Sequence, residues 1–224
     1  MQKIAVLICF IFSIQVFGAN SVVGHWEGVI IHEGKEWRTW LDVKLVEAKL
    51  SGTIDFPDFG LYALPANLAV ENEKIKIGTI AGNSVATFDG TLNNENLNGE
   101  WKGLNITATF NLKRLNVKPL EPYIEEEVAF QNGDATLVGT LVKPNKSGKH
   151  PAIIFTHGSG NQTRTQSNYR SRAYLFARNG IVALIYDRRG TGASKGGGDN
   201  ANWNNLADDA VAGLKMLQAR SDIH

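Results

Sequence analysis

The sequence predicts an α+β protein of two domains, an antiparallel β-barrel or sandwich followed by the opening half of an α/β sheet. Residues 21–114 repeat short strands and turns with almost no helical period. Residues 152–160 and 181–194 each run from an apolar strand into a glycine-containing turn, and a helical segment lies between the two strands. Two such strands joined by a helix form a βαβ unit, which indicates that the second domain mixes helices with parallel strands.

Composition narrows the class of partner. A chain of 224 residues, 43% of them hydrophobic, is long enough to bury the cores of one or two domains. The 23 basic and 22 acidic residues give a net charge of +1, so bulk charge favours neither nucleic acid nor an anionic membrane as a partner. We therefore expect a small-molecule ligand.

Residues 1–19 have the pattern of a secretory signal peptide. Lys3 supplies a positive charge, residues 4–14 form an apolar stretch, and residues 16–18 resemble a cleavage site. A retained membrane anchor is the alternative, but the apolar stretch is shorter than a spanning helix needs. Because the single cysteine, Cys9, lies in this leader, we expect a secreted or periplasmic protein without disulfides and without a membrane anchor after cleavage.

Residues 20–115 are predicted to form the β-barrel-like domain. In residues 36–45, hydrophobic and polar side chains alternate as in a half-buried antiparallel strand. A Gly-x-Trp-x-Gly pattern occurs at residues 24–28 near the first strand and again at residues 99–103 near the last. If the sheet closes, the first and last strands meet, and Trp26 and Trp101 are then expected to plug the barrel together.

This segment is similar to the lipocalin-like β-domains that precede the hydrolase in some secreted bacterial enzymes. Trp26, Trp37, Trp40 and Trp101 form either a binding surface for sugar or lipid, or the core and rim aromatics of the barrel, which we favour. Trp40 is the exception, because strict alternation places it on the polar face of its strand.

The second domain begins after a linker at residues 116–124, which contains Pro119 and Pro122 and has no periodicity. Residues 125–130 and 136–142 are predicted to form a hairpin around the Asn132-Gly133 turn. A helix is expected at about residues 168–179. A second helix is expected after Asn205 as N-cap, with an apolar stripe at Leu206, Ala210, Leu214 and Leu217.

Two motifs in this domain suggest a family. His157-Gly158-Ser159-Gly160 follows one predicted strand, and Asp187-Arg188-Arg189-Gly190-Thr191-Gly192-Ala193-Ser194 follows the next. Their order, spacing and strand contexts resemble the α/β-hydrolases, in particular secreted serine hydrolases akin to the serine aminopeptidases and acyl esterases. The resemblance covers residues 125–224, which would be a partial α/β-hydrolase domain. It implies that the nucleophile lies beyond His224 and that the chain is truncated, so no catalytic triad residue is expected within it.

The same resemblance implies an oxyanion hole. Its best candidate donor is the backbone amide of Ser159, with the amides of Gly158 and Gly160 close behind. Asp187 and Arg188 are expected to brace the neighbouring loop, and His157 to support the turn. The expected substrate is a small-molecule ester or a peptide, with ester, amide and thioester bonds all left open.

One serine motif in the chain is misleading. Residues 192–196 satisfy Gly-x-Ser-x-Gly around Ser194, but the serine follows a loop and precedes glycines, whereas a nucleophile elbow joins a strand directly to a helix. The histidines lack the ligand spacing of a zinc site, and the glycine-rich loops match neither phosphate-binding fingerprint. We therefore expect no metal and no cofactor.

Three hypotheses for function follow. The first is a secreted serine hydrolase of ester or amide bonds, of which this chain alone is inactive. The alternative is a non-enzymatic protein whose β-domain binds a lipid or glycan and whose hydrolase half is incomplete. The third is a structural role in which that half pairs with another chain. A truncated sheet exposes an edge and an apolar face, so we also expect self-association.

Overall fold

The computed structural model of the chain describes residues 21–81, 84–158, 160–197 and 201–224. These residues divide between two compact units, Met1–Pro119 and Leu120–His224. The leader predicted at residues 1–19 lies outside the described residues, and export stays a prediction. Residues 116–122 form no strand or helix and connect the last strand of the first unit to the first strand of the second.

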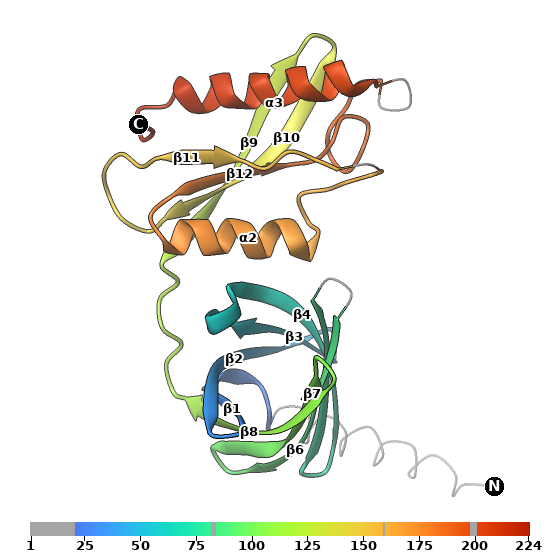
Figure 1. Cartoon of the computed structure of the whole chain (residues 1–224), viewed down its shortest axis with the longest axis vertical. Coiled ribbons are helices and arrows are strands. Elements are labelled where there is room, and N and C mark those ends of the chain that lie inside the picture. Colours follow the sequence, from blue (N-terminus) through green and yellow to red (C-terminus); the bar gives the residue numbers. More distant parts are fainter. Residues whose placement is uncertain (1–20, 82–83, 159, 198–200) are drawn as a thin grey trace, which may run out of the picture. The chain divides into compact units, whose positions relative to one another are not determined.

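The first unit is a closed barrel of eight antiparallel strands (Figure 1). Each strand pairs with its neighbour in sequence, and the barrel closes because the first strand also pairs with the last. This confirms the predicted N-terminal antiparallel β-domain and shows that it is a barrel, not a sandwich. The strands are β1 (Gly24–His32), β2 (Lys35–Val46), β3 (Lys49–Phe56), β4 (Leu61–Glu71), β5 (Lys74–Ala81), β6 (Ser84–Asn93), β7 (Asn96–Gly103) and β8 (Ile106–Leu115), with a 3-10 turn, η1 (Pro57–Phe59), between β3 and β4.

Apolar side chains fill the barrel. Alternation along each strand directs one set of side chains inward, and an eight-stranded barrel is just wide enough for such side chains to occupy its interior. The rings of Phe56 and Phe88 stack at 6.4 Å, and Phe88 meets Phe110 edge to face at 5.0 Å. The other fully buried large side chains around them are Ile30, Leu41, Ile54, Ile75, Ile77, Leu97 and Leu112.

The two Gly-x-Trp-x-Gly segments lie at opposite ends of the barrel. On β8, the partner of Trp26 is Arg114 and the partner of Trp101 is Ala108, six positions away, a separation of about 20 Å along a strand. The expectation that the two tryptophans plug the barrel together is therefore wrong. Close strand approach accounts for one glycine of each segment, because a Cβ at Gly28 would lie 1.9 Å from the Asn111 backbone oxygen and a Cβ at Gly99 would lie 2.0 Å from the Asp89 backbone oxygen. It does not account for Gly24, where a Cβ would meet nothing closer than 3.9 Å.

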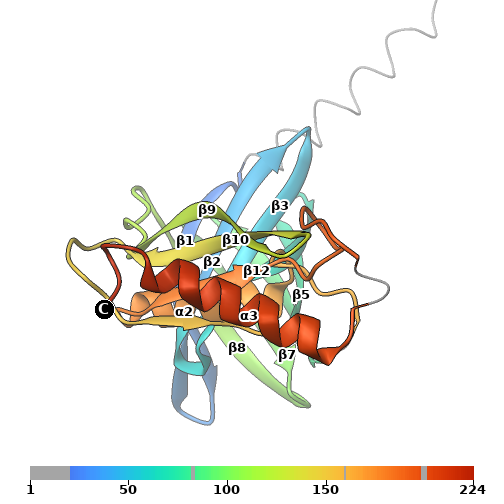
Figure 2. The same cartoon turned by 90° about the horizontal axis from the view of Figure 1, so that it is seen from above.

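The second unit contains a four-stranded mixed sheet in the order β11-β12-β10-β9, with one helix on each face (Figure 1, Figure 2). Only β11 and β12 are parallel, and the other two pairs are antiparallel. The elements are β9 (Tyr123–Asn132), β10 (Ala135–Pro144), β11 (Ala152–Ile154), α2 (Ser167–Arg178), β12 (Val182–Tyr186) and α3 (Trp203–Gln218).

The hairpin and the two helices predicted in this unit are present, with differences in detail. The two-residue turn of the β9–β10 hairpin is Gly133-Asp134, one residue after the predicted Asn132-Gly133 pair, and Gly133 has a left-handed φ of +59°. Helix α3 differs from the prediction at its start, because its N-cap is Asn202. The Asn202 side chain accepts from the Asn205 backbone N–H, and the Asn205 side chain accepts from the Asn202 N–H. Leu214, placed by the prediction on the packed face, is 45% exposed.

The resemblance to the α/β-hydrolases is wrong. The molecule is mostly β-structure, at 54%, with a closed antiparallel barrel and two α-helices among the described residues, which is not an α/β-hydrolase fold. The two motifs misled because an apolar strand ending in a glycine turn is a local feature. The fold depends on how many strands pair and in which direction, which such motifs do not specify.

Among the residues that the structure describes, no helix combines the length and the apolar character needed to cross a membrane.

Candidate ligand-binding site

One end of the barrel is closed by Trp26. Its side chain is fully buried, and its indole N–H donates to the Val22 carbonyl over 2.9 Å. The Arg114 guanidinium lies 4.5 Å from the centre of the same ring and donates to the carbonyls of Val23 and Ser21. These contacts tie the segment before β1 to this end of the barrel.

The opposite end, which we call the mouth, carries a row of aromatic rings. Trp37 lies at its centre, with ring centroids 6.1 Å from Trp101 and 5.5 Å from Phe59, both edge to face, and 6.0 Å from His32 in a stacked arrangement. Phe59 is 46% exposed and Trp37 is half-buried. The mouth therefore presents aromatic surface to solvent above a filled interior.

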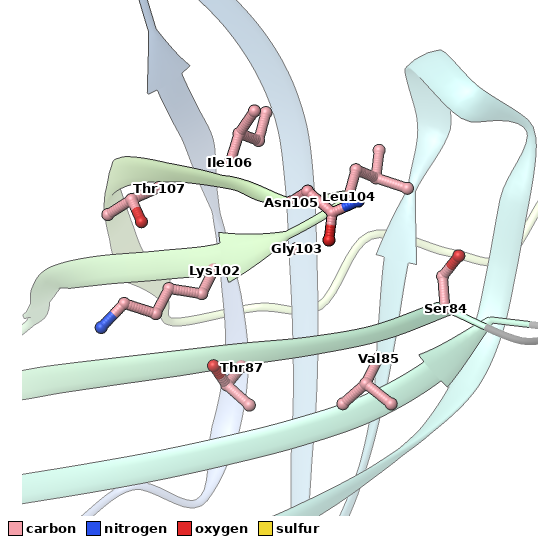
Figure 3. A pocket seen from close by; sticks show the side chains of 9 residues that line it. All are labelled: Ser84, Val85, Thr87, Lys102, Gly103, Leu104, Asn105, Ile106 and Thr107. Carbon is pink, nitrogen blue, oxygen red and sulfur yellow. The ribbon is translucent and has the colours of Figure 1, made fainter.

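A groove lies beside this row, at the rim of the barrel. Figure 3 shows that its walls come from the start of β6 and from the β7–β8 hairpin, which face each other across the opening. Its volume is about 750 Å³, within the range of small-molecule sites. The residues that line it are Ser84, Val85, Thr87, Lys102, Gly103, Leu104, Asn105, Ile106 and Thr107.

The groove lining is mainly uncharged. Ser84, Thr87, Thr107 and Asn105 offer three hydroxyls and an amide, which both donate and accept hydrogen bonds. The charge of Lys102 is directed to Glu100, whose carboxylate lies 2.5 Å from the ammonium group. The hydrogen bond that Lys102 donates to Glu100 raises the pKa of Lys102, so this lysine stays charged. The lining suits a neutral ligand that is rich in hydroxyls.

Apolar surface accompanies these polar groups. Val85 is 60% exposed and Leu104 is 58% exposed, on opposite walls of the groove. Exposed large apolar side chains beside a hollow are typical of binding sites. A ligand with both apolar faces and hydroxyl groups would match both parts of the lining.

Trp101 connects the groove to the aromatic row. A Cβ at Gly103, which lines the groove, would lie 2.5 Å from the Trp101 ring, so the ring packs directly over this glycine. Trp101 is only 4% exposed, and its indole Nε1 has no hydrogen-bond partner among the described residues. Buried N–H groups are nearly always paired, so this donor marks a place where an acceptor is needed.

Trp40 has a different environment. It lies on the outer face of β2, as strict alternation predicts, and its ring centroid is 6.5 Å from that of Tyr62. Of the four tryptophans considered as a binding surface, Trp26 belongs to the core, and Trp37 and Trp101 lie at the mouth.

The residues predicted to form an oxyanion hole lie in a loop of the second unit. Ser159 lies outside the described residues, and Gly158 and Gly160 are exposed. The Nε2 of His157 is 2.6 Å from the Tyr186 carbonyl, to which it donates, and the His157 ring packs edge to face on Tyr186 at 4.3 Å. Burial lowers the pKa of His157 below its usual value, so the imidazole is neutral at pH 7.

Hydrogen bonds join this loop to the loop after β12. The buried Asp187 carboxylate accepts from the backbone N–H groups of Arg164 and Ala193, at 2.8 and 2.9 Å. The Arg188 guanidinium donates to the Gly160 carbonyl at 2.7 Å. These contacts hold the two loops together.

Ser194 is engaged by the backbone. Its hydroxyl donates to the Asp187 carbonyl at 2.7 Å and accepts from the Val138 N–H at 2.9 Å, and the residue is 6% exposed. A serine held in this way is not available as a nucleophile. Among the described residues, no group of three or more histidine, cysteine, aspartate or glutamate side chains is placed to hold a metal ion.

Comparison of the chain with models of known protein families and with curated proteins finds no match.

The groove residues were not predicted from the sequence, because serine and threonine are ordinary residues of exposed strand faces. The turn residues do not single out the groove either. The β7–β8 turn places Leu104 and Asn105 at φ values of +52° and +61°, where a two-residue hairpin favours Asn-Gly. Glu47 and Ala48 depart from this preference in the same way in the β2–β3 turn, away from the groove.

Proposed function

We propose that the barrel unit binds a glycan at the rim groove. The observation that carries the proposal is the groove itself, a hollow of about 750 Å³ lined by hydroxyl and amide groups alternating with exposed apolar side chains. Sugars present the same combination, because their hydroxyls form hydrogen bonds while their C–H faces pack on apolar surface.

The filled interior supports a glycan over a lipid. Barrels that enclose a hydrophobic ligand hold it inside, in a central cavity. Here large side chains such as Phe88 and Phe110 occupy the centre of the barrel, which leaves the rim and the mouth as the surfaces for a ligand. A shallow site lined by neutral polar groups fits a sugar better than an acyl chain.

We further propose that the protein is exported, on the strength of the leader pattern at residues 1–19. Export places the groove among the glycans of the periplasm or the cell exterior. The groove does not require a catalytic function of the second unit, so the proposal concerns binding alone.

The proposal can be tested by applying the full chain to an array of neutral and charged glycans, and by titrating the neutral glycans that bind while tryptophan fluorescence is recorded. Thr87→Val removes a groove hydroxyl while keeping the shape of the side chain. Since one hydrogen bond contributes about 1 kcal/mol, we expect binding about fivefold weaker.

The matched control is Thr109→Val, on the outer face of β8 away from the groove. It should leave affinity unchanged. Equal weakening by both substitutions would reject the groove as the site. If a fluorescent fatty acid bound and no glycan did, the ligand of the barrel would be a lipid and not a glycan.

A further inference from the structure

We infer that the ligand is a linear oligosaccharide, which extends from the groove across the mouth of the barrel onto Trp37 and Phe59. This inference rests on the proposed function and names the form of its ligand. Three features carry it: an unpaired donor at the boundary between groove and mouth, the aromatic row of the mouth, and a strained leucine on the groove wall at the hairpin tip.

The unpaired donor is the indole N–H of Trp101. The ring packs over Gly103 on the groove side and meets Trp37 on the other, so it lies where a ligand would pass from groove to mouth. A buried donor without an acceptor costs stability in the unliganded protein. Because the nitrogen itself is buried, a sugar oxygen can become its acceptor only if the Trp101 ring shifts when the ligand binds.

The aromatic row continues from this point. Successive ring centroids are 6.1 Å apart from Trp101 to Trp37 and 5.5 Å apart from Trp37 to Phe59, and each step is comparable to the length of one sugar unit. Phe59, at the end of the row, is 46% exposed and projects from η1 on the far side of the mouth. Trp101 is buried at the groove end of the row, so the exposed aromatic surface is that of Trp37 and Phe59. This surface lies beyond the groove, where it would contact only the further units of a sugar chain.

The strained residue is Leu104. A bulky residue at a φ of +52° is disfavoured relative to asparagine or glycine, yet this leucine is 58% exposed and packs in no core. Glu47 and Ala48 have the same kind of backbone in the β2–β3 turn, so it is the exposure of Leu104 beside the groove that distinguishes it. Its position on the groove wall gives it a role in contacting the apolar face of a sugar.

The test is isothermal titration of the full chain with cello-, malto- and chito-oligosaccharides, comparing the disaccharide with the tetrasaccharide of each series. For a series that binds, we expect the tetrasaccharide to bind about tenfold more tightly, because only the longer chain reaches Phe59.

Two substitutions separate the parts of the site. Phe59→Ala should abolish the advantage of the tetrasaccharide and leave disaccharide affinity unchanged. Leu104→Asn should weaken both lengths while raising the melting temperature, since asparagine suits the turn. Val46→Ala, exposed at the opposite end of the barrel, is the control and should change neither.

The outcomes separate this inference from the function on which it rests. Equal affinity for the two chain lengths would overturn the extension across the mouth and leave the groove as the site of a short glycan. If Val46→Ala lost as much tetrasaccharide affinity as Phe59→Ala, the extension across the mouth would also be overturned. Binding of no oligosaccharide, on the array or by titration, would overturn the proposed function and the extension together.

Discussion

At the scale of single residues, the most consequential polar contact is the pair of Arg189 and Asp209. The guanidinium donates two hydrogen bonds to the carboxylate, at 2.8 and 2.6 Å, and the two side chains are 6% and 1% exposed. Asn132 donates a further bond to the carboxylate at 2.7 Å. The pair anchors the loop after β12 to the first turns of α3.

Arg189→Met should therefore destabilise the second unit by about 3–5 kcal/mol, because it leaves the Asp209 charge buried without its partner. The free energy of unfolding in urea measures this loss. Arg172→Ala, an exposed arginine of α2, should change the same quantity by less than about 0.5 kcal/mol. Similar changes in unfolding free energy for the two variants would show that the buried pair contributes no more to stability than an exposed arginine does.

The residue scale also shows where sequence analysis succeeds and where it fails. The position of Trp40 on an outer face followed from strict alternation along a strand. The environment of Leu104 did not, because its exposure and its backbone angle depend on how the β7–β8 hairpin ends beside β6. The unpaired indole of Trp101 is likewise invisible in sequence, since hydrogen-bond partners come from distant segments.

At the scale of elements, the barrel depends on glycines where strands approach closely. A Cβ at Gly99 would lie 2.0 Å from the Asp89 backbone oxygen, and strand pairing prevents that oxygen from moving away. Gly99→Ala should therefore destabilise the barrel by about 3 kcal/mol. Chemical denaturation followed by tryptophan fluorescence measures the effect.

Gly78→Ala is the matched control, because nothing lies within 4 Å of a Cβ at that strand position. It should be neutral or slightly stabilising, since alanine restricts the unfolded chain. A barrel that tolerates Gly99→Ala as well as Gly78→Ala would show that close strand approach does not explain the glycine at position 99.

A charged network joins β9 and β10 to the segment after α3. Arg220 contacts Glu126 at 2.7 Å and Asp222 at 2.8 Å, and Lys143 contacts the same two carboxylates. Hydrogen bonds from Arg220 are the largest cause that lowers the pKa of both carboxyl groups, and Lys143 adds to the effect.

This network predicts acid sensitivity of the second unit. A carboxyl group whose pKa is lower in the folded state contributes stability above its unfolded pKa of about 4 and loses that contribution as pH falls through the folded value. Glu126→Gln should therefore reduce the slope of unfolding free energy against pH below about pH 4.

Urea denaturation at several pH values tests this, with Glu127→Gln as the control, because Glu127 is 73% exposed. The control should keep the slope of the unmodified protein. If Glu126→Gln also kept the slope of unfolding free energy against pH of the unmodified protein, the network would not be a source of acid sensitivity.

At the scale of the whole molecule, the exposed apolar surface of the second unit favours self-association. Helix α3 carries Trp203, Val211 and Leu214 at 71%, 46% and 45% exposure, spaced so that they share one side of the helix. We expect light scattering to show a mass that rises with concentration, and Leu214→Glu to reduce that rise. Val117→Glu, in the exposed connector between the units, is the control and should have no effect. A concentration-independent monomer mass would contradict this expectation.

The whole chain is also expected to show no serine-hydrolase turnover. The motif serine, Ser194, is buried with its hydroxyl bonded to two backbone groups, so it cannot attack a substrate. Incubation with a fluorophosphonate probe followed by mass spectrometry should detect no labelled serine. Stoichiometric labelling of any serine would reject the prediction.

The sequence by itself determined the strands, hairpins and helices, because alternation, helical period and turn residues act between near neighbours in the chain. It correctly predicted an antiparallel β-domain, the β9–β10 hairpin and the βαβ unit. Only the tertiary structure decided that β1 pairs with β8, that Trp26 and Trp101 lie at opposite ends, and that the second unit is not an α/β-hydrolase fold. It also brought β6 and the β7–β8 hairpin together around a groove. These features depend on strand pairing and side-chain packing between distant segments, which local sequence patterns do not encode.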